Sequence, residues 1–180
     1  MIDEAADGGD LTTVDDCVVG VAQEEAEGTY APTGDGDLER TEPDDENCHL
    51  EVAVTDAADG RFVPEPTVRA TLSPNDGDEG VGPFEGPSIR HPGLHHYGKN
   101  VEVPGDGEYD LTIEVDPPEF MCHGEENGDR DAASVEVAFE GVEVETGQDW
   151  SGPPVDVRTG TRSDRIAKRH ALGRVRNRCV

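Results

Sequence analysis

The sequence predicts an all-β protein built as an antiparallel β-sandwich. Short stretches of alternating apolar and polar residues recur along the chain, and clusters of Gly, Pro, Asn and Asp separate them at regular spacing. No stretch before residue 160 shows a convincing helical period. Because aromatic residues make up only 4% of the chain, we expect a thin core of Val, Leu, Ile and Ala.

The first part of the chain contains few strand signals. Cys17–Ala22 is a continuous apolar run, as expected of one buried strand, and Gly28–Thr33 is a short extended piece. The stretch from Gly34 to Asn47 is rich in Gly, Asp, Glu and Pro and predicts a loop. We expect residues 1–11, which are mostly polar and acidic, to be disordered.

The next stretch, His49–Thr55, predicts a strand whose two faces differ. Its leucine and two valines point to one side, where they can fill a core. His49 and Glu51 share the other side, about 7 Å apart along the strand. Both side chains can therefore turn toward one ion.

Three further regions complete the predicted sandwich. Thr67–Leu72 is a strand, and Asn100–Val103 is expected to form a hairpin with Glu108–Val115, the clearest alternation in the chain. Glu126–Asp131 predicts a polar turn. Ser134–Glu145 then gives two short alternating runs broken at a glycine.

The charge balance argues against nucleic acid as a partner. The 180 residues include 42 acidic and 14 basic ones, for a formal net charge of -28 at pH 7, whereas phosphate binding needs clustered Lys and Arg. Only two of the basic residues are lysines. This composition fits the solvated surface of a folded protein from a high-salt organism, where screening reduces self-repulsion.

The last part of the chain inverts this composition. Residues 151–180 hold eight of the 14 basic residues and only two acidic ones. We expect this basic tail to be disordered or not to be native coding sequence. A basic arm that binds nucleic acid or a membrane surface is the alternative.

No apolar run approaches the roughly 18 residues that span a membrane. The acidic N-terminus lacks the basic and apolar regions of a signal peptide. These two observations leave either a cytoplasmic protein or a chain that is part of an exported one.

Histidines carry the strongest functional signal. Imidazole is the commonest side-chain ligand for late transition metals. The turn-prone stretch Pro87–Asn100 predicts a loop and holds three of the six histidines: His91, His95 and His96. His49 lies near Glu51, and His123 follows a methionine and a cysteine. Separated histidines that the fold brings together would form a metal site.

A site formed by His49, Glu51, His96 and His123 would combine imidazole nitrogens with one carboxylate. Such a set suits copper, iron or zinc and is too rich in nitrogen for calcium or magnesium. Met121 or a neighbouring cysteine could add a soft ligand.

The same convergence would bring two cysteines together. Cys48 precedes His49 and Cys122 precedes His123, so we predict a disulfide or close thiols between them. If their Cα atoms lie more than about 7 Å apart, Cys48 is simply a buried apolar residue.

The ordered set of His49-Leu50-Glu51, then His96-Tyr97-Gly98-x-Asn100, then a strand and a late His123 resembles the periplasmic iron-transport proteins of bacteria. The resemblance covers roughly residues 12–145 and implies an immunoglobulin-like sandwich that binds copper or iron at His49, Glu51, His96 and His123. We expect the whole metal-binding domain to span residues 12–150. The resemblance further implies an extracytoplasmic location, a homodimer and delivery of iron to a membrane permease.

The chain departs from this family at one ligand. The family's methionine is expected seven residues before His96, where this chain has Ile89, which cannot coordinate a metal. His91 is the nearest replacement, and Met121 is another candidate. A site of imidazoles and a carboxylate should lose the preference for Cu(I) and bind divalent ions, more weakly as the pH falls through about 6.5.

We therefore expect a carrier or sensor of iron or copper, and two alternatives remain. A small metalloenzyme could use Glu51 or Glu125 as a base, although no HExxH spacing or nucleophile–base pair supports it. A structural or adhesion sandwich on the cell surface would carry its histidines incidentally and bind no metal.

Overall fold

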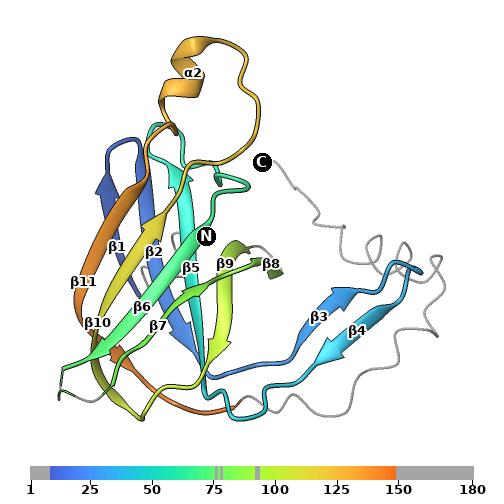
Figure 1. The fold of residues 1–180 in the computed structure, drawn as a ribbon, viewed down its shortest axis with the longest axis vertical. Coiled ribbons are helices and arrows are strands. Elements are labelled where there is room, and N and C mark those ends of the chain that lie inside the picture. The colour runs from blue at the N-terminus through green and yellow to red at the C-terminus, as the bar shows by residue number, and fades with distance from the viewer. Residues whose placement is uncertain (1–8, 76, 78, 92–93, 149–180) are drawn as a thin grey trace, which may run out of the picture. The chain divides into compact units, whose positions relative to one another are not determined.

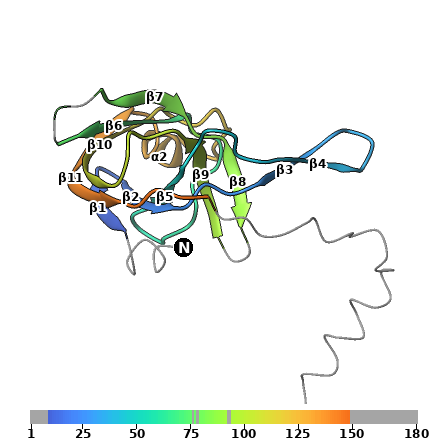
Figure 2. The same cartoon turned by 90° about the horizontal axis from the view of Figure 1, so that it is seen from below.

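The computed structural model describes residues 9–148 apart from 76, 78, 92 and 93. Two antiparallel sheets form separate layers (Figures 1 and 2). The strands of the first sheet are, in spatial order, β1 (Asp10–Val14), β2 (Cys17–Glu24), β5 (Cys48–Asp56), β9 (Leu94–Val101) and β8 (Ser88–His91). Those of the second are β11 (Val135–Val144), β10 (Gly107–Val115), β6 (Val68–Pro74) and β7 (Val81–Glu85). The predicted antiparallel β-sandwich is confirmed.

The core lies between the two sheets and is mainly aliphatic. Its largest fully buried apolar side chains include Leu50 of β5, Leu72 of β6, and Leu111 and Ile113 of β10. The predicted alternation holds in β10, where the inward residues are buried and the outward ones are mostly exposed. In β5, every residue except the last is buried, on both faces of the strand. β2 and β9 pair with its two edges, so β5 lies inside the five-stranded sheet.

Two stretches predicted as loops contain strands. Within the stretch from Gly34 to Asn47, β4 (Leu38–Thr41) pairs with β3 (Thr29–Pro32) in a separate two-stranded sheet. Within Pro87–Asn100, β8 and β9 form a hairpin, with Ile89 opposite His96. Turn-forming residues are abundant in both stretches, but they mark where strands end and do not prevent the residues between them from pairing.

The predicted hairpin between Asn100–Val103 and Glu108–Val115 is wrong. β9 pairs with β5 and β8, whereas β10 pairs with β6 and β11, so the chain changes sheets between β9 and β10. Alternation identifies which face of a strand is buried, but it does not identify the neighbouring strand.

β11 is one continuous strand and not two. It passes through Gly141, which adopts a positive φ of 66°. The register with β10 shifts between Tyr109 and Leu111, and the Gly141 N–H donates to Asp110 Oδ1 at 3.0 Å. The glycine therefore marks a β-bulge, where a residue without a Cβ adopts this conformation at low cost.

The connection between β10 and β11 contains one short helix, α2 (Glu125–Asp129), in place of the predicted polar turn. Arg130, just after this helix, forms an ion pair with Asp56 at the end of β5, with 2.8 Å between Nη2 and Oδ1. This pair holds the connection against the five-stranded sheet.

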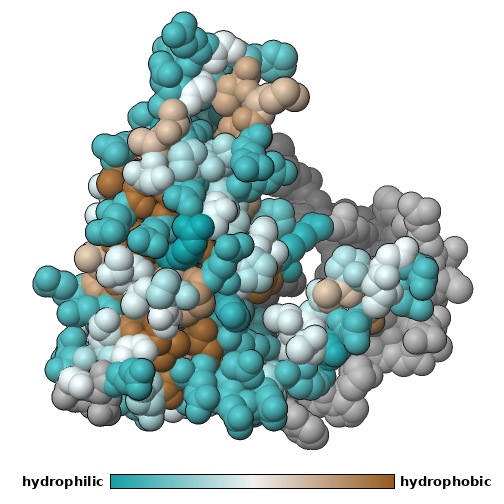
Figure 3. Space-filling view, viewed as in Figure 1, coloured by the Kyte–Doolittle hydropathy of each residue, from teal (hydrophilic) through white to brown (hydrophobic). Residues whose placement is uncertain are grey.

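The chain divides into two units, residues 1–150 and 151–180. The predictions for the basic tail lie outside the described residues, as does most of the predicted disordered N-terminus, although β1 already begins at Asp10. No helix in the described part of the chain is long and apolar enough to cross a membrane. The face visible in Figure 3 is largely hydrophilic, in keeping with the acidic composition.

Candidate metal centre

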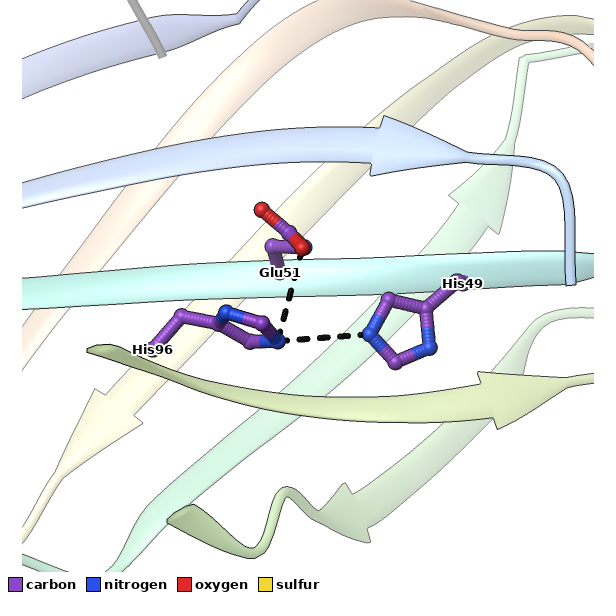
Figure 4. Close-up of side chains that lie close together, drawn as sticks. All are labelled: His49, Glu51 and His96. Carbon is purple, nitrogen blue, oxygen red and sulfur yellow. Dashed lines mark hydrogen bonds and ion pairs between the residues drawn. The ribbon is translucent and has the colours of Figure 1, made fainter. Parts of the chain in front are cut away.

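Two neighbouring strands of the first sheet bring His49, Glu51 and His96 together (Figure 4). β5 carries His49 and Glu51, and the paired strand β9 has Asn100 opposite His49 and Gly98 opposite Glu51. Because side chains alternate along a strand, His96, two residues from Gly98, lies on the same face. The prediction that His49 and Glu51 share a face therefore agrees with this geometry.

The donor atoms of these three residues lie at distances suited to one ion. His96 Nε2 is 3.4 Å from His49 Nε2 and 3.4 Å from Glu51 Oε1, and one ligand atom from each residue lies within 4.8 Å of the other two. Two atoms that bind a metal at about 2.1 Å with a tetrahedral angle between them are about 3.4 Å apart. The residues present therefore fit a transition-metal ion.

All three side chains are buried, with exposed fractions of 0% for His49, 6% for Glu51 and 1% for His96. Burial of polar or ionisable groups costs free energy that apolar side chains at the same positions would not cost. Only one other polar residue among the described ones, Thr55, is buried to this degree. The concentration of this cost at one place indicates a functional site.

Small residues next to Glu51 leave room for the two imidazoles. Ala22 of β2 and Gly98 of β9 lie opposite Glu51 on its two sides. A Cβ atom on Gly98 would lie 2.8 Å from His96 Cδ2 and 3.0 Å from His49 Nε2. Gly98 is thus part of the site, because only a hydrogen fits where another residue would carry a side chain.

Asn100 is a second residue that the sequence analysis did not assign to the site. Its Oδ1 lies 2.7 Å from His49 Nδ1, the ring nitrogen that faces away from His96. Asn100 belongs to the motif His96-Tyr97-Gly98-x-Asn100, but the pattern alone predicts a function only for the histidine.

The remaining predicted ligands are not part of this group in the described chain. His123 is exposed between β10 and α2, and its carbonyl accepts a hydrogen bond from Asn127. Met121 is 97% exposed. His91 pairs with Leu94 through the β8–β9 register, and its side chain lies outside the described part. Their role as ligands stays a prediction.

Ile89, at the position expected for the family's methionine, lies opposite His96 across the β8–β9 pair and is half-buried. Directly opposite residues of an antiparallel pair share a face. The position is therefore next to the site, and its side chain in this chain has no ligand atom.

The predicted disulfide between Cys48 and Cys122 is wrong, because both thiols are free. Cys48 is buried, since alternation along β5 turns it away from the face of His49 and into the core. Burial raises the pKa of the Cys48 thiol to about 11. Cys122 is exposed. Cys48 is therefore a buried free cysteine of the core, whose Sγ donates to Gln23 Oε1 at 3.6 Å, and the proximity of the two thiols stays a prediction.

An antiparallel β-sandwich with a buried group of two histidines and a glutamate is a structure that could hold a metal ion. The chain belongs to the family of Fe2+ transport proteins, whose sequence model matches residues 29–152. This membership confirms the resemblance read from the motifs. No curated protein sequence matches the chain.

Solved structures share the fold. FetP of uropathogenic Escherichia coli strain F11 is 17% identical, with a TM-score of 0.59 over 77% of this chain and 95% of that chain. Copper-reconstituted P19 of Campylobacter jejuni is 18% identical, with a TM-score of 0.55 over 75% of this chain and 94% of that chain. A copper-bound P19 variant with methionine replaced by isoleucine is also 18% identical, with a TM-score of 0.59 over 77% of this chain and 96% of that chain.

Proposed function

We propose that the protein binds an Fe2+ or copper ion as its cargo at His49, Glu51 and His96 and acts in iron uptake or metal homeostasis. The observation that carries this proposal is the group of three buried donor atoms within 4.8 Å of one another. Family membership supports an iron cargo, and the copper-bound similar structures support copper. Zinc accepts the same ligands.

The donor set accounts for the kind of ion. His49 and His96 each offer an imidazole nitrogen, and Glu51 offers a carboxylate that would offset one positive charge of a divalent ion. Nitrogen and oxygen donors without a sulfur suit divalent iron, copper and zinc, whereas Cu(I) prefers thioether or thiolate ligands. Ile89 opposite His96 therefore favours a divalent cargo. The copper-bound P19 variant with isoleucine in place of a methionine supports a site of this kind.

Three protein donors are fewer than the four of a closed tetrahedral site. We propose His91, His123 and Met121 as the candidates for a further ligand, supplied by the same chain or by a second copy. Alanine variants of each, titrated with Cu2+, identify the ligand as the variant whose affinity falls at least about tenfold, roughly 1.4 kcal/mol. If all three alanine variants keep the affinity of the unmodified chain, the remaining ligand comes from solvent or from the protein that receives the ion.

The test of the proposed function compares two adjacent histidines. The chain, produced without a His-tag and stripped with a chelator in high salt, is titrated calorimetrically with Cu2+, with Zn2+ and, without oxygen, with Fe2+. His96→Ala should weaken binding by at least about 100-fold, roughly 2.8 kcal/mol, because a buried donor is lost. His95→Ala should change little, since His95 is exposed and contacts Phe62.

Equal affinities of His96→Ala and His95→Ala would refute the proposed site. Complete absence of binding by the unmodified chain would instead favour an adhesion sandwich with incidental histidines. Metal-dependent turnover would favour the enzyme alternative. Elemental analysis of protein from its own host identifies the physiological ion.

We further propose an extracytoplasmic homodimer that hands iron to a membrane permease in a high-salt organism. Support comes from the resemblance to periplasmic iron-transport proteins and from the net charge of -28. Cell fractionation tests the location, and light scattering in high salt tests the oligomeric state.

A further inference from the structure

We propose that Asn100 is a positioning residue that selects the metal-binding nitrogen of His49 by holding the imidazole with its proton on Nδ1. The inference rests on the proposed metal site, but the tautomer it assigns is a property of the metal-free protein. A neutral histidine carries one proton on one of two nitrogens, and only the other nitrogen can bind a metal.

The contact between the two side chains leaves the direction of the hydrogen bond open. His49 Nδ1 and Asn100 Oδ1 are 2.7 Å apart, which is a short hydrogen bond. The imidazole nitrogen can donate or accept, and the two ends of an amide are easily exchanged. The direction must therefore come from the other partners of Asn100.

The backbone of Glu27 decides how the amide is oriented. Asn100 Nδ2 donates to the Glu27 carbonyl oxygen at 2.7 Å, and the Glu27 N–H donates to Asn100 Oδ1 at 3.4 Å. A peptide carbonyl only accepts and a peptide N–H only donates. If the amide nitrogen and oxygen of Asn100 were exchanged, the amide oxygen would lie 2.7 Å from the Glu27 carbonyl oxygen, and the amide NH2 would face the Glu27 N–H. The atom that faces His49 is therefore the amide oxygen.

An amide oxygen only accepts hydrogen bonds, so His49 Nδ1 must donate. The neutral imidazole then has its lone pair on Nε2, and this atom lies 3.4 Å from His96 Nε2. Asn100 thus leaves free for the ion the one nitrogen of His49 that faces the other ligands. An N–H held by an acceptor in this way also orients the ring and raises the basicity of the ligand nitrogen.

The position of Glu27 is itself held by the fold. Its neighbour Ala26 is fully buried, at 0% exposed, and the Ala26 N–H donates to the Gly147 carbonyl at 2.9 Å. The Gly147 N–H in turn donates to the Asn47 carbonyl, next to β5, at 2.8 Å. The backbone groups that orient Asn100 are therefore fixed before any ion arrives.

The test reads the tautomer directly. Long-range 1H–15N correlation spectra of the metal-free protein, at pH 8 to 9 where histidine is ordinarily neutral, distinguish a protonated ring nitrogen from an unprotonated one. We expect His49 to carry its proton on Nδ1 in the unmodified chain. Asn100→Ala should give a mixture of both tautomers and bind Cu2+ about tenfold to 100-fold more weakly, as for other partners of metal-bound histidines.

Two further variants keep the test decisive. Asn47→Ala removes a comparable amide, which bridges the N–H and C=O of Val103 at 2.9 and 3.0 Å without touching His49, and should leave the tautomer unchanged. Asn100→Leu keeps a side chain of similar size without an acceptor for Nδ1, so it should also give a mixture of tautomers, and it decides the matter if Asn100→Ala does not fold.

A proton on His49 Nε2 in the unmodified chain overturns the inference, as does an unchanged tautomer in Asn100→Ala. A proton on Nδ1 that becomes mixed in Asn100→Ala, in a chain that binds no metal, would support the positioning role of Asn100 while the proposed function fails. The two failures are therefore distinguishable.

Discussion

The nine-residue strands β5 and β10 occupy interior positions in the two sheets. They differ in whether their polar side chains are buried or exposed. On β10, the polar residues between the core positions face outward, and Asp110 and Glu114 are exposed. On β5, His49 and Glu51 occupy the equivalent alternating positions but are buried. The same period of two therefore yields a solvated surface on one strand and a closed polar group on the other.

This difference in burial shows which polar residues are compatible with a stable fold and which are retained at a cost to stability. Exposed carboxylates on β10 keep their hydration and cost the folded chain little. The buried imidazoles and carboxylate of β5 and β9 have lost that hydration, so they lower stability relative to apolar side chains unless they are paired. Substitutions on the two strands should accordingly affect stability and metal binding in different ratios.

The largest expected effect comes from closing the space beside β5. In Gly98→Ala, the added Cβ would meet His96 Cδ2 at 2.8 Å, His49 Nε2 at 3.0 Å and the Leu50 carbonyl at 2.9 Å, and a backbone oxygen cannot easily move away. We expect Cu2+ binding to be lost and stability to fall by about 1–3 kcal/mol from overpacking. Calorimetric titration and thermal unfolding measure the two effects.

A matched glycine provides the control. A Cβ on Gly105, in the connection between β9 and β10, would have no atom within 4 Å, so Gly105→Ala should leave both affinity and stability nearly unchanged. Full Cu2+ affinity in Gly98→Ala would mean that the space next to the imidazoles is not where the ion binds.

The second prediction exchanges a carboxylate for an amide on each strand. Glu51→Gln should weaken Cu2+ binding by at least about tenfold, roughly 1.4 kcal/mol, because the ion loses a charged ligand. The stability of the metal-free protein should change less than metal binding does, since glutamine keeps a polar group that can hydrogen-bond to His96 Nε2, which lies 3.4 Å from Glu51 Oε1. Glu114→Gln, on the exposed face of β10, should alter neither quantity measurably. A large loss of stability in metal-free Glu51→Gln would show that Glu51 serves the fold.

Sequence patterns predicted the local features of the fold and the site, but not those that depend on long-range pairing. Alternation within His49–Thr55 was sufficient to put His49 and Glu51 on one face, because strand geometry is local. It could not reveal that this face is buried, since the burial of a strand face depends on long-range packing of the chain. For the same reason the partner of β9 was predicted wrongly as β10.

The motif pattern identified His96 as a site residue but did not identify Gly98 and Asn100. Gly98 matters through an absent Cβ, and Asn100 matters through the backbone of Glu27. Neither property can be predicted from the sequence, because both depend on contacts between segments that are far apart along the chain. His123 illustrates the opposite case, because its place in the order of motifs contains no information about its distance from His49 in the folded chain.

The smallest expected effect concerns the ion pair just after β10, where Arg69 Nη1 lies 2.6 Å from Asp116 Oδ2. Hydrogen bonds from Arg69 and from Ser134 lower the pKa of Asp116 below its usual value. A carboxylate whose pKa is lower in the folded chain than in the unfolded one stabilises the fold above the unfolded pKa, and this contribution is lost as the pH falls through the folded pKa.

Asp116→Asn should therefore lower Tm by a few degrees at most at pH 7, and the difference from the unmodified chain should disappear in acid. Both groups of the pair are partly exposed, so the difference should also shrink as salt is raised. Cu2+ affinity should stay unchanged, because the pair is on the four-stranded sheet and the ligands are on the other. A Tm difference that stays constant as the pH falls through the pKa of folded Asp116 would contradict the role of the ion pair, and a change in Cu2+ affinity would contradict the separation of fold and site between the two sheets.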